Sequence, residues 1–266
     1  MNIIKLFKSF LPSNIKNYFK EKLNLNVIIW LPSKYILNQE ITVSKYTKDF
    51  VFIANGVNPI NDTLYEIFDY DCYFLDNYYN LFNQSLVFDI GANIGVYSVI
   101  ASNFGAKVIA IEPDKANIEY LSKNMLLNNC NFEIINSLVY SKRGLINFNM
   151  LGSVSNSIIF EDDQNNTNKI ESITISDIIG KVNSNEYKYK ILKMDIEGAE
   201  YSIFENIDFD LYFFDIYVME IHDINKSKNL NTFLTFFDNT FEIIIKKDFH
   251  NRNFLNTIIA IKKNLC

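Results

Sequence analysis

A glycine-rich turn is the first part of the chain whose residue types suggest chemistry. A buried strand predicted for Leu86–Ile90 runs into Gly91-Ala92-Asn93-Ile94-Gly95, and a helix predicted for Ile94–Phe104 follows. Free backbone N–H groups at the start of such a helix can bind an anionic group of a ligand. A dinucleotide site would have the pattern Gly-x-Gly-x-x-Gly, and its middle glycine is missing here. The turn therefore favours a carboxylate over a pyrophosphate.

Two acidic residues flank this turn. Asp89 lies two residues before Gly91, where a carboxylate would repel a pyrophosphate but suits a ligand that carries an ammonium and a sulfonium. Glu112 ends the second predicted strand, next to Pro113, where it can accept hydrogen bonds from both hydroxyls of a ribose. The alternative is a turn that only links a strand to a helix. We predict cofactor contacts from Asp89, Gly91, Ala92, Asn93, Gly95, Glu112 and Pro113.

The end of the third predicted strand, Asn131–Tyr140, supplies the next candidates. Parallel strands of an open α/β sheet bind ligands at their carboxyl ends. Ser137 and Leu138 should therefore lie beside the base of a nucleoside ligand, where the Ser137 hydroxyl or a backbone amide can hydrogen-bond it.

An acid-rich segment ends the fourth predicted strand. Lys193, Asp195 and Glu197 alternate with apolar residues and share one face of a strand. We predict that Asp195 contacts both the cofactor and the reacting groups. The alternative is a solvated strand end in which Glu197 and Glu200 cap the following helix, and for Glu200 we favour that interpretation.

The fifth predicted strand ends with two more polar side chains, Glu220 and His222. They lie two residues apart and so share a face. We expect them to lie beside Asp195 across adjacent strands.

The elements that must position these residues alternate between strands and helices. Such alternation predicts a Rossmann-like α/β fold with a mostly parallel sheet covered on both faces. The last two strands are joined by a loop too short for a crossover helix, so they should form an antiparallel hairpin. The predicted strands are Leu86–Ile90, Lys107–Ile111, Asn131–Tyr140, Tyr189–Asp195, Phe214–Ile221, Phe241–Lys247 and Leu255–Ile261. The predicted helices are Ile94–Phe104, Asp114–Asn128 and Ser227–Phe237, and Ile173–Ile179 is predicted as a short helix or a turn.

Two stretches are predicted with less regular structure. Gly144–Met150 is expected to form a hairpin with the end of the third strand, and the polar, low-complexity residues 151–170 are expected to form a surface loop, with a lid as the functional alternative.

We place the Rossmann-like domain at residues 81–266 and an N-terminal extension at 1–80. Residues 1–25 alternate apolar and basic positions and predict a helical arm that packs on its own domain or on a partner subunit. The alternative is an amphipathic anchor to an anionic membrane surface or to a membrane-bound assembly. Short strands are predicted at 27–31 and 41–54, and an aromatic-rich helix at 61–82.

Composition limits the function classes. The 266 residues carry a formal net charge of −6 and no long basic stretch, which argues against nucleic acid as a partner. The three cysteines lie far apart and suggest a reducing compartment without a disulfide framework. We found no signal peptide pattern and no apolar run long enough to span a bilayer, so we expect a cytoplasmic location, at the inner membrane face if the arm is an anchor. The oligomeric state is open, with a homodimer as one option.

Taken together, these segments resemble the FkbM family of S-adenosylmethionine-dependent O-methyltransferases over about residues 60–250. The matching segments are Phe88-Asp89-Ile90-Gly91-Ala92-Asn93-Ile94-Gly95, Ile111-Glu112-Pro113, Leu192-Lys193-Met194-Asp195-Ile196-Glu197-Gly198-Ala199-Glu200 and Glu220-Ile221-His222. The resemblance implies S-adenosylmethionine as the cofactor and a hydroxyl acceptor, either on a sugar of a surface polysaccharide or its precursor or on a polyketide natural product. The competing hypotheses are a non-catalytic nucleoside-binding or scaffold module in glycan assembly and an NAD-dependent sugar dehydrogenase.

An alcohol is a poor nucleophile, so a base near the attacking oxygen assists methyl transfer. We predict His222 or Asp195 as that base, with Glu220 orienting its partner and Lys193 keeping Asp195 ionised. This hypothesis uses no metal. The alternative is a divalent ion, Mg²⁺ or Mn²⁺, held by Asp195, Glu220 and His222.

Overall fold

The computed structural model describes residues 40–54, 63–149, 157–158, 168–225, 227–247 and 255–265. The predicted arm at 1–25, the strand at 27–31 and most of the 151–170 loop lie outside the described residues. None of the described helices is both long and apolar enough to cross a membrane.

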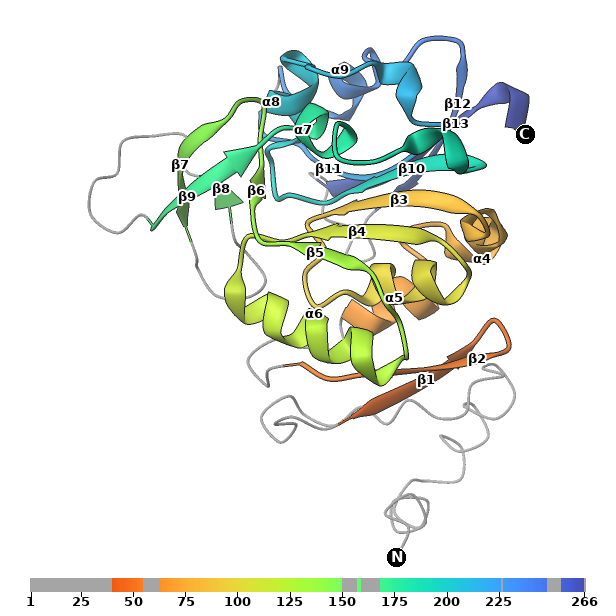
Figure 1. The fold of residues 1–266 in the computed structure, drawn as a ribbon. Coiled ribbons are helices and arrows are strands. Elements are labelled where there is room, and N and C mark those ends of the chain that lie inside the picture. The colour runs from red at the N-terminus through yellow and green to blue at the C-terminus, as the bar shows by residue number, and fades with distance from the viewer. Residues whose placement is uncertain are drawn as a thin grey trace, which may run out of the picture.

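A seven-stranded sheet forms the centre of the fold (Figure 1). Its strands, in spatial order, are β12 (Phe241–Lys247), β13 (Leu255–Lys262), β11 (Ile216–His222), β10 (Tyr189–Met194), β3 (Ser85–Ile90), β4 (Lys107–Ile111) and β5 (Glu133–Ile135). The five strands from β11 to β5 are parallel, and β13 pairs antiparallel with both β11 and β12. The predicted Rossmann-like class and the C-terminal antiparallel hairpin are both confirmed.

Helices cover both faces of this sheet. Helices α5 (Val96–Asn103) and α6 (Lys115–Leu127) lie on one face, and α7 (Ile175–Ile179), α8 (Glu200–Glu205) and α9 (Leu230–Leu234) lie on the other (Figure 1). The Asp114 side chain caps α6 as predicted, because it accepts a hydrogen bond from the Ala116 N–H at 2.8 Å.

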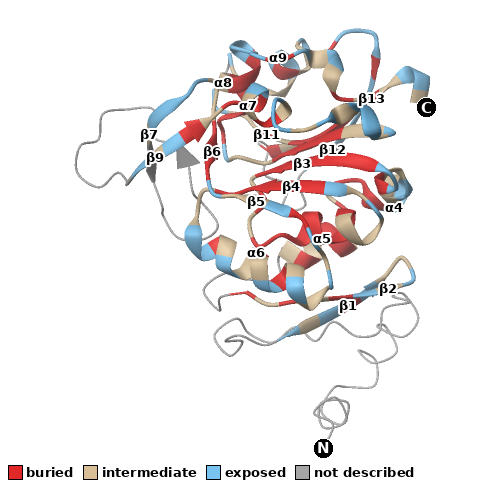
Figure 2. Ribbon diagram, viewed as in Figure 1, coloured by how far each residue is buried: buried red, intermediate tan, exposed pale blue. Residues whose placement is uncertain are grey.

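The alternation of side chains along β3 divides the interior into two cores. Val87 packs into the core under α5 and α6, whereas Leu86, Phe88 and Ile90 pack into the core under α7, α8 and α9. All six residues of β3 are buried, as Figure 2 shows for the central strands. A central strand that is buried on both faces is what a covered parallel sheet requires.

The predicted third strand and its hairpin are wrong in part. Asn131–Tyr140 is not one strand but two short ones, β5 in the main sheet and β6 (Leu138–Val139) in a separate four-stranded sheet. That smaller sheet has the order β6-β9-β7-β8, with β7 at Gly144–Asn149, β8 at Ser157–Ile158 and β9 at Asn168–Ile173. Gly144 onwards therefore pairs with β9 rather than with the preceding strand, and residues 168–170 belong to a strand rather than to the predicted loop.

The N-terminal part packs against the α5 and α6 side. Strands β1 (Ile41–Lys45) and β2 (Lys48–Phe52) form an antiparallel hairpin below α6 (Figure 1). The side chain of Asn128, the C-cap of α6, bonds the backbone of Val51 in β2, and the Asn124 side chain on α6 bonds the backbone of Ile53 just after β2. These contacts fix the hairpin to the helix.

The predicted helix at 61–82 is broken into short pieces. The structure has a π-helix at Tyr65–Asp69, α4 at Leu75–Tyr78 and a 3-10 helix at Tyr79–Phe82. Asp71 and Phe74 have positive φ, 57° and 59°, and this left-handed backbone cannot continue a helix.

Candidate active site

The glycine turn closes onto the end of β10. Gly91 has φ +73°, and a Cβ there would lie 1.8 Å from the carbonyl oxygen of Asp195. Any side chain at this position would therefore push the two strand ends apart. The N–H groups of Gly91 and Ala92 both donate to the Ile111 carbonyl at 3.0 Å, so the turn is also tied to β4.

A buried ion pair lies behind the turn. Asp89 is fully buried on β3, and its carboxylate lies 3.2 Å from the Lys193 ammonium and accepts a hydrogen bond from the Ser98 hydroxyl at 2.6 Å. Lys193 also donates to the Gly91 carbonyl at 2.8 Å. The structure thus places the Asp89 carboxylate against protein groups, and Asp89 is not among the residues that line the cavity described below.

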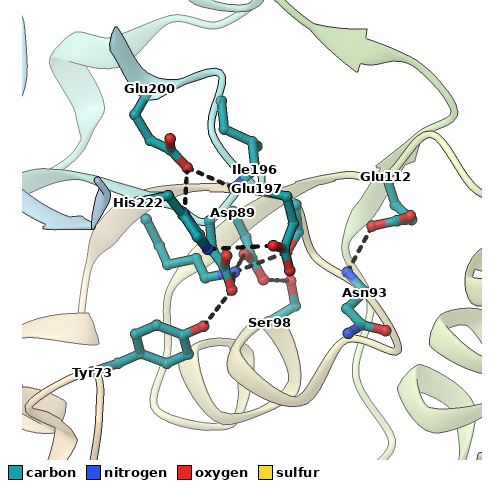
Figure 3. Close-up of polar contacts among 12 residues, drawn as sticks. Tyr73, Asp89, Asn93, Ser98, Glu112, Ile196, Glu197, Glu200 and His222 are labelled. Carbon is teal, nitrogen blue, oxygen red and sulfur yellow. Dashed lines mark hydrogen bonds and ion pairs between the residues drawn. The ribbon is translucent and has the colours of Figure 1, made fainter. Parts of the chain in front are cut away.

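Glu112 supports the other side of the turn. Its Oε1 accepts hydrogen bonds from the Asp114 N–H at 3.0 Å and the Asn117 amide at 3.2 Å, and its Oε2 accepts one from the Asn93 N–H at 2.8 Å (Figure 3). Burial raises the pKa of Glu112 to about 7, although these hydrogen bonds oppose the shift. The carboxylate therefore changes its charge near neutral pH.

The predicted base-binding residues follow β5. Ser137 is buried, and its hydroxyl already donates to the Glu171 carbonyl at 3.1 Å. Leu138 starts β6 and packs against Ala199. Both residues line the cavity, as Pro113 does at the end of β4.

Asp195 lies at the centre of the acidic cluster, which comprises Asp195, Glu197, Glu200 and Glu220 together with His222. Its Oδ2 accepts a hydrogen bond from the Tyr73 hydroxyl at 2.8 Å and lies 4.0 Å from the Lys193 ammonium. Burial alone would raise the pKa of Asp195. The nearby charges of Lys193 and His222, together with hydrogen bonds from Glu220 and Tyr73, outweigh burial and hold this pKa below its usual value. Burial and the adjacent Asp195 carboxylate raise the pKa of Glu220 well above its usual value, so Glu220 holds the proton of this carboxyl pair.

His222 lies between two other carboxylates. Its Nε2 is 3.3 Å from Glu197 Oε2 and its Nδ1 is 3.2 Å from Glu200 Oε1, and Figure 3 marks both contacts by dashed lines. Although burial alone would lower it, these two carboxylates raise the pKa of His222 well above its usual value. The imidazole therefore carries a proton on each nitrogen. Glu200, the first residue of α8, also accepts hydrogen bonds from the N–H groups of Ile196 and Gly198, which precede that helix. The predicted capping role at a solvated strand end is therefore wrong, because no side-chain hydrogen bond caps α8 and the buried Glu200 instead ties the turn after β10 to His222.

The three predicted groups of the alternative metal site do lie together. One ligand atom each from Asp195, Glu220 and His222 falls within 4.8 Å of the others. However, both nitrogens of His222 already face carboxylates, so coordination would require breaking one of these contacts.

A cavity of about 390 Å³ joins the glycine turn to the acidic cluster, a volume within the range of small-molecule sites. It is lined by Gly91, Ala92, Asn93, Glu112, Pro113, Ser137, Leu138, Lys193, Asp195, Glu220 and His222, all predicted from the sequence. Gly95 does not line it and instead supports the turn, since its Cβ would lie 2.9 Å from Leu121. The cavity also has a wall that we did not predict, formed by Thr63, Glu66, Ile67, Tyr70, Cys72 and Tyr73.

The residues around the turn fit a nucleoside with an amino-acid tail. Glu112 offers an acceptor to a ribose, and the buried side-chain oxygen of Asn93 has no hydrogen-bond partner and can accept from a ligand donor. Gly91 also lines this cavity, and its missing side chain allows the backbone of Asp195 to lie directly against the turn.

Comparison with known families decides the class. Residues 89–253, more than half of the chain, match the model of the family described as the methyltransferase FkbM domain. The chain belongs to the FkbM methyltransferase family. It is therefore an S-adenosylmethionine-dependent methyltransferase, and the match begins at Asp89 and contains the glycine turn, Glu112 and the acidic cluster.

No curated protein sequence matches this FkbM methyltransferase. Among solved structures, an rRNA methylase from Streptococcus thermophilus is 12% identical with a TM-score of 0.45, and the alignment covers 71% of this chain and 96% of that one. A putative methyltransferase from Streptococcus mutans in complex with SAH is 10% identical with a TM-score of 0.45, covering 71% and 97%. An O-methyltransferase from Bacillus cereus in complex with SAH is 10% identical with a TM-score of 0.44, covering 73% and 81%.

Proposed function

We propose that this FkbM methyltransferase transfers a methyl group to a hydroxyl of a sugar in a surface polysaccharide or its precursor. The observation that carries the proposal is the Asp195 carboxylate, which lines the same cavity as the glycine turn and lies between Lys193 and Tyr73. A positioned base is what an alcohol acceptor requires and what a more nucleophilic acceptor needs less.

The geometry favours Asp195 over His222 as that base. His222 carries a proton on both nitrogens and cannot accept another. Asp195 remains ionised because Lys193 and His222 stabilise its charge. We therefore assign proton acceptance to Asp195 and assign to His222 the role of holding Glu197 and Glu200, and with them the turn that follows β10.

Glu220 completes this arrangement. Its proton is shared with Asp195, so the pair carries one negative charge instead of two. When Asp195 accepts the proton of the acceptor hydroxyl, both carboxyl groups of the pair are protonated and the pair becomes neutral. The proton transfer therefore adds no charge to the pair. The carboxyl pair therefore carries at most one negative charge throughout the reaction.

The walls at this end of the cavity suit a polyhydroxylated acceptor. Tyr70 and Tyr73 contribute aromatic rings, while their hydroxyls donate to the Lys247 carbonyl and to Asp195, and Glu66 and Thr257 add polar groups to the wall. Among the described lining residues the one lysine is Lys193, and its ammonium already contacts Asp89, the Gly91 carbonyl and Asp195. This lining favours a neutral hydroxyl compound over a phosphorylated one.

S-adenosylmethionine supplies the electrophilic methyl group when it is bound. The chain's contribution is position. The backbone carbonyl of Asp195 lies directly against Gly91, so the donor site and the residue that carries the base are held by the same backbone contact. Fixing two reactants in the reacting geometry can supply several kcal/mol of the acceleration, up to about 7–11 kcal/mol in well-oriented model reactions.

The test is mass spectrometry of the surface glycans of cells with and without the gene. We expect the loss of one O-methyl group on a defined sugar, restored by the wild-type gene and not by Asp195→Asn. Unchanged glycans together with a missing methyl group on a secreted small molecule would instead support the polyketide acceptor that the family resemblance also allows.

A further inference from the structure

We infer that Tyr73 is a positioning residue for methyl transfer, because its hydroxyl fixes the orientation of the Asp195 carboxylate. The inference rests on the proposed role of Asp195 as the base. Tyr73 lies outside the family-matched residues 89–253, in the irregular segment between the π-helix and α4. Its Oη donates to Asp195 Oδ2 at 2.8 Å, across 122 residues of sequence.

The ring of Tyr73 is held by contacts that do not involve its hydroxyl. It packs edge-on against Tyr97 with ring centroids 5.6 Å apart, and the Lys193 ammonium lies 5.1 Å from its centroid. The residue is only 8% exposed. A substitution that removes the hydroxyl alone should therefore leave the ring in place.

The backbone around Tyr73 is also fixed. Asp71 and Phe74, on either side, both have left-handed φ values, which cost free energy in residues other than glycine. The Asp71 carboxylate lies 3.4 Å from the Lys246 ammonium on β12, so the segment is anchored to the far edge of the sheet. Such a conformation persists only where the surrounding contacts hold it.

The Tyr73 hydroxyl restricts the rotation of the Asp195 carboxylate. Lys193 and Glu220 both attract this carboxylate, and rotation toward either would change the oxygen that faces the acceptor. A hydrogen bond from Tyr73 to Oδ2 opposes that rotation. Burial and the nearby Asp195 raise the pKa of Tyr73 well above its usual value, so the phenol stays a donor and does not act as the base itself.

The experiment compares Tyr73→Phe with Tyr217→Phe. Tyr217 is a matched control because it is fully buried in the opposite core. Its substitution also removes a single hydrogen bond, which the Tyr217 hydroxyl donates to the Leu211 carbonyl. Turnover is measured with labelled S-adenosylmethionine and surface glycans from cells that lack the gene, and S-adenosylhomocysteine affinity is measured by calorimetry. We expect Tyr73→Phe to lower kcat about tenfold or more, the lower end of a hydrogen bond to a charged group. The KM for S-adenosylmethionine and the affinity for S-adenosylhomocysteine should change less than about twofold. Tyr217→Phe should leave kcat unchanged.

A double-mutant comparison with Asp195→Asn separates this inference from the proposed function. If Tyr73 acts through Asp195, adding Tyr73→Phe to Asp195→Asn should cause little further loss. If Asp195→Asn is inactive while Tyr73→Phe turns over at the wild-type rate, the positioning role is wrong and the base assignment stands. If Asp195→Asn keeps wild-type turnover, the base assignment itself is wrong. A parallel loss of kcat and of S-adenosylhomocysteine affinity in Tyr73→Phe would show a structural role and overturn the inference.

Discussion

Glu112 allows the ribose contact to be tested with a magnitude taken from the structure. An ionised carboxylate has about four acceptor positions. Asp114, Asn117 and Asn93 fill three of those on Glu112, which leaves one position on Oε2. We therefore expect one ribose hydroxyl to bond Glu112, where the sequence suggested both. One hydrogen bond to a charged group contributes about 1.5–3 kcal/mol, or about 10- to 150-fold in dissociation constant.

A simple loss of affinity in a Glu112 variant would not isolate this contact. The carboxylate also holds the Asn93 N–H, so its removal loosens the turn itself. The sharper assay is calorimetry of Glu112→Gln with S-adenosylhomocysteine and with its 2′-deoxy and 3′-deoxy analogues. In the wild type, one of the two analogues should bind about 10- to 150-fold more weakly than the parent. In Glu112→Gln that difference should largely disappear.

The control is Glu119→Gln, an exposed residue on α6, which should discriminate among the three ligands as the wild type does. Equal discrimination by the wild type and Glu112→Gln would refute the assignment of Glu112 to the ribose.

The raised pKa of Glu112 adds a pH dependence to the same measurement. Burial raises this pKa to about 7, so the free protein holds the carboxyl protonated below that pH. A ribose hydroxyl that donates to Glu112 favours the ionised form, and binding must then displace the proton. We expect S-adenosylhomocysteine affinity to be constant above about pH 7 and to fall up to about tenfold per pH unit below it. Glu112→Gln should show no such decline between pH 5.5 and 7.

Three further outcomes are expected. Lys193→Met should lower the free energy of unfolding in urea by about 3–5 kcal/mol, because it leaves Asp89 buried without its cation. Adding Asp89→Asn should recover part of that loss, and a double variant no more stable than the single one would contradict this account. Gly91→Ala should abolish S-adenosylhomocysteine binding because its Cβ meets the Asp195 carbonyl, whereas Gly144→Ala, with a positive φ but open space around it, should bind normally. Asp195→Asn should lower kcat at least about a hundredfold with little effect on cofactor affinity, and EDTA should leave wild-type turnover intact; inhibition by EDTA that Mg²⁺ or Mn²⁺ reverses would establish the metal alternative.

The sequence predicted those parts of the fold that local signals determine. The apolar run of β3, the capping residue Asp114 and the pair of C-terminal strands all lie where they were expected. The candidate site was predictable for the same reason, because parallel strands bring their carboxyl ends to one edge whatever the details of packing. Asp195, Glu220 and His222 meet there as a consequence.

The parts that could not be predicted depend on contacts between distant segments. Whether Asn131–Tyr140 forms one strand or two depends on β6 pairing with β9, more than 30 residues later. The contact of Tyr73 with Asp195 spans 122 residues, and a tyrosine in an aromatic-rich segment gives no local sign of such a partner. His222 was identified correctly as part of the cluster, but its protonation depends on Glu197 and Glu200, whose direction is set by the left-handed turn at Glu197 and Gly198.

Lys193 explains why donor site and base are built from one set of contacts. Its ammonium contacts the Asp89 carboxylate on β3, the Gly91 carbonyl in the turn and the Asp195 carboxylate at the end of β10. β3 and β10 are neighbours at the point where the chain order of the sheet reverses, which is where open α/β sheets bind ligands. A buried cation shared in this way makes separation of the two strand ends costly, because each anionic partner would lose its compensation. The distance between the cofactor turn and Asp195 is thus set by charge as well as by the absence of a side chain at Gly91.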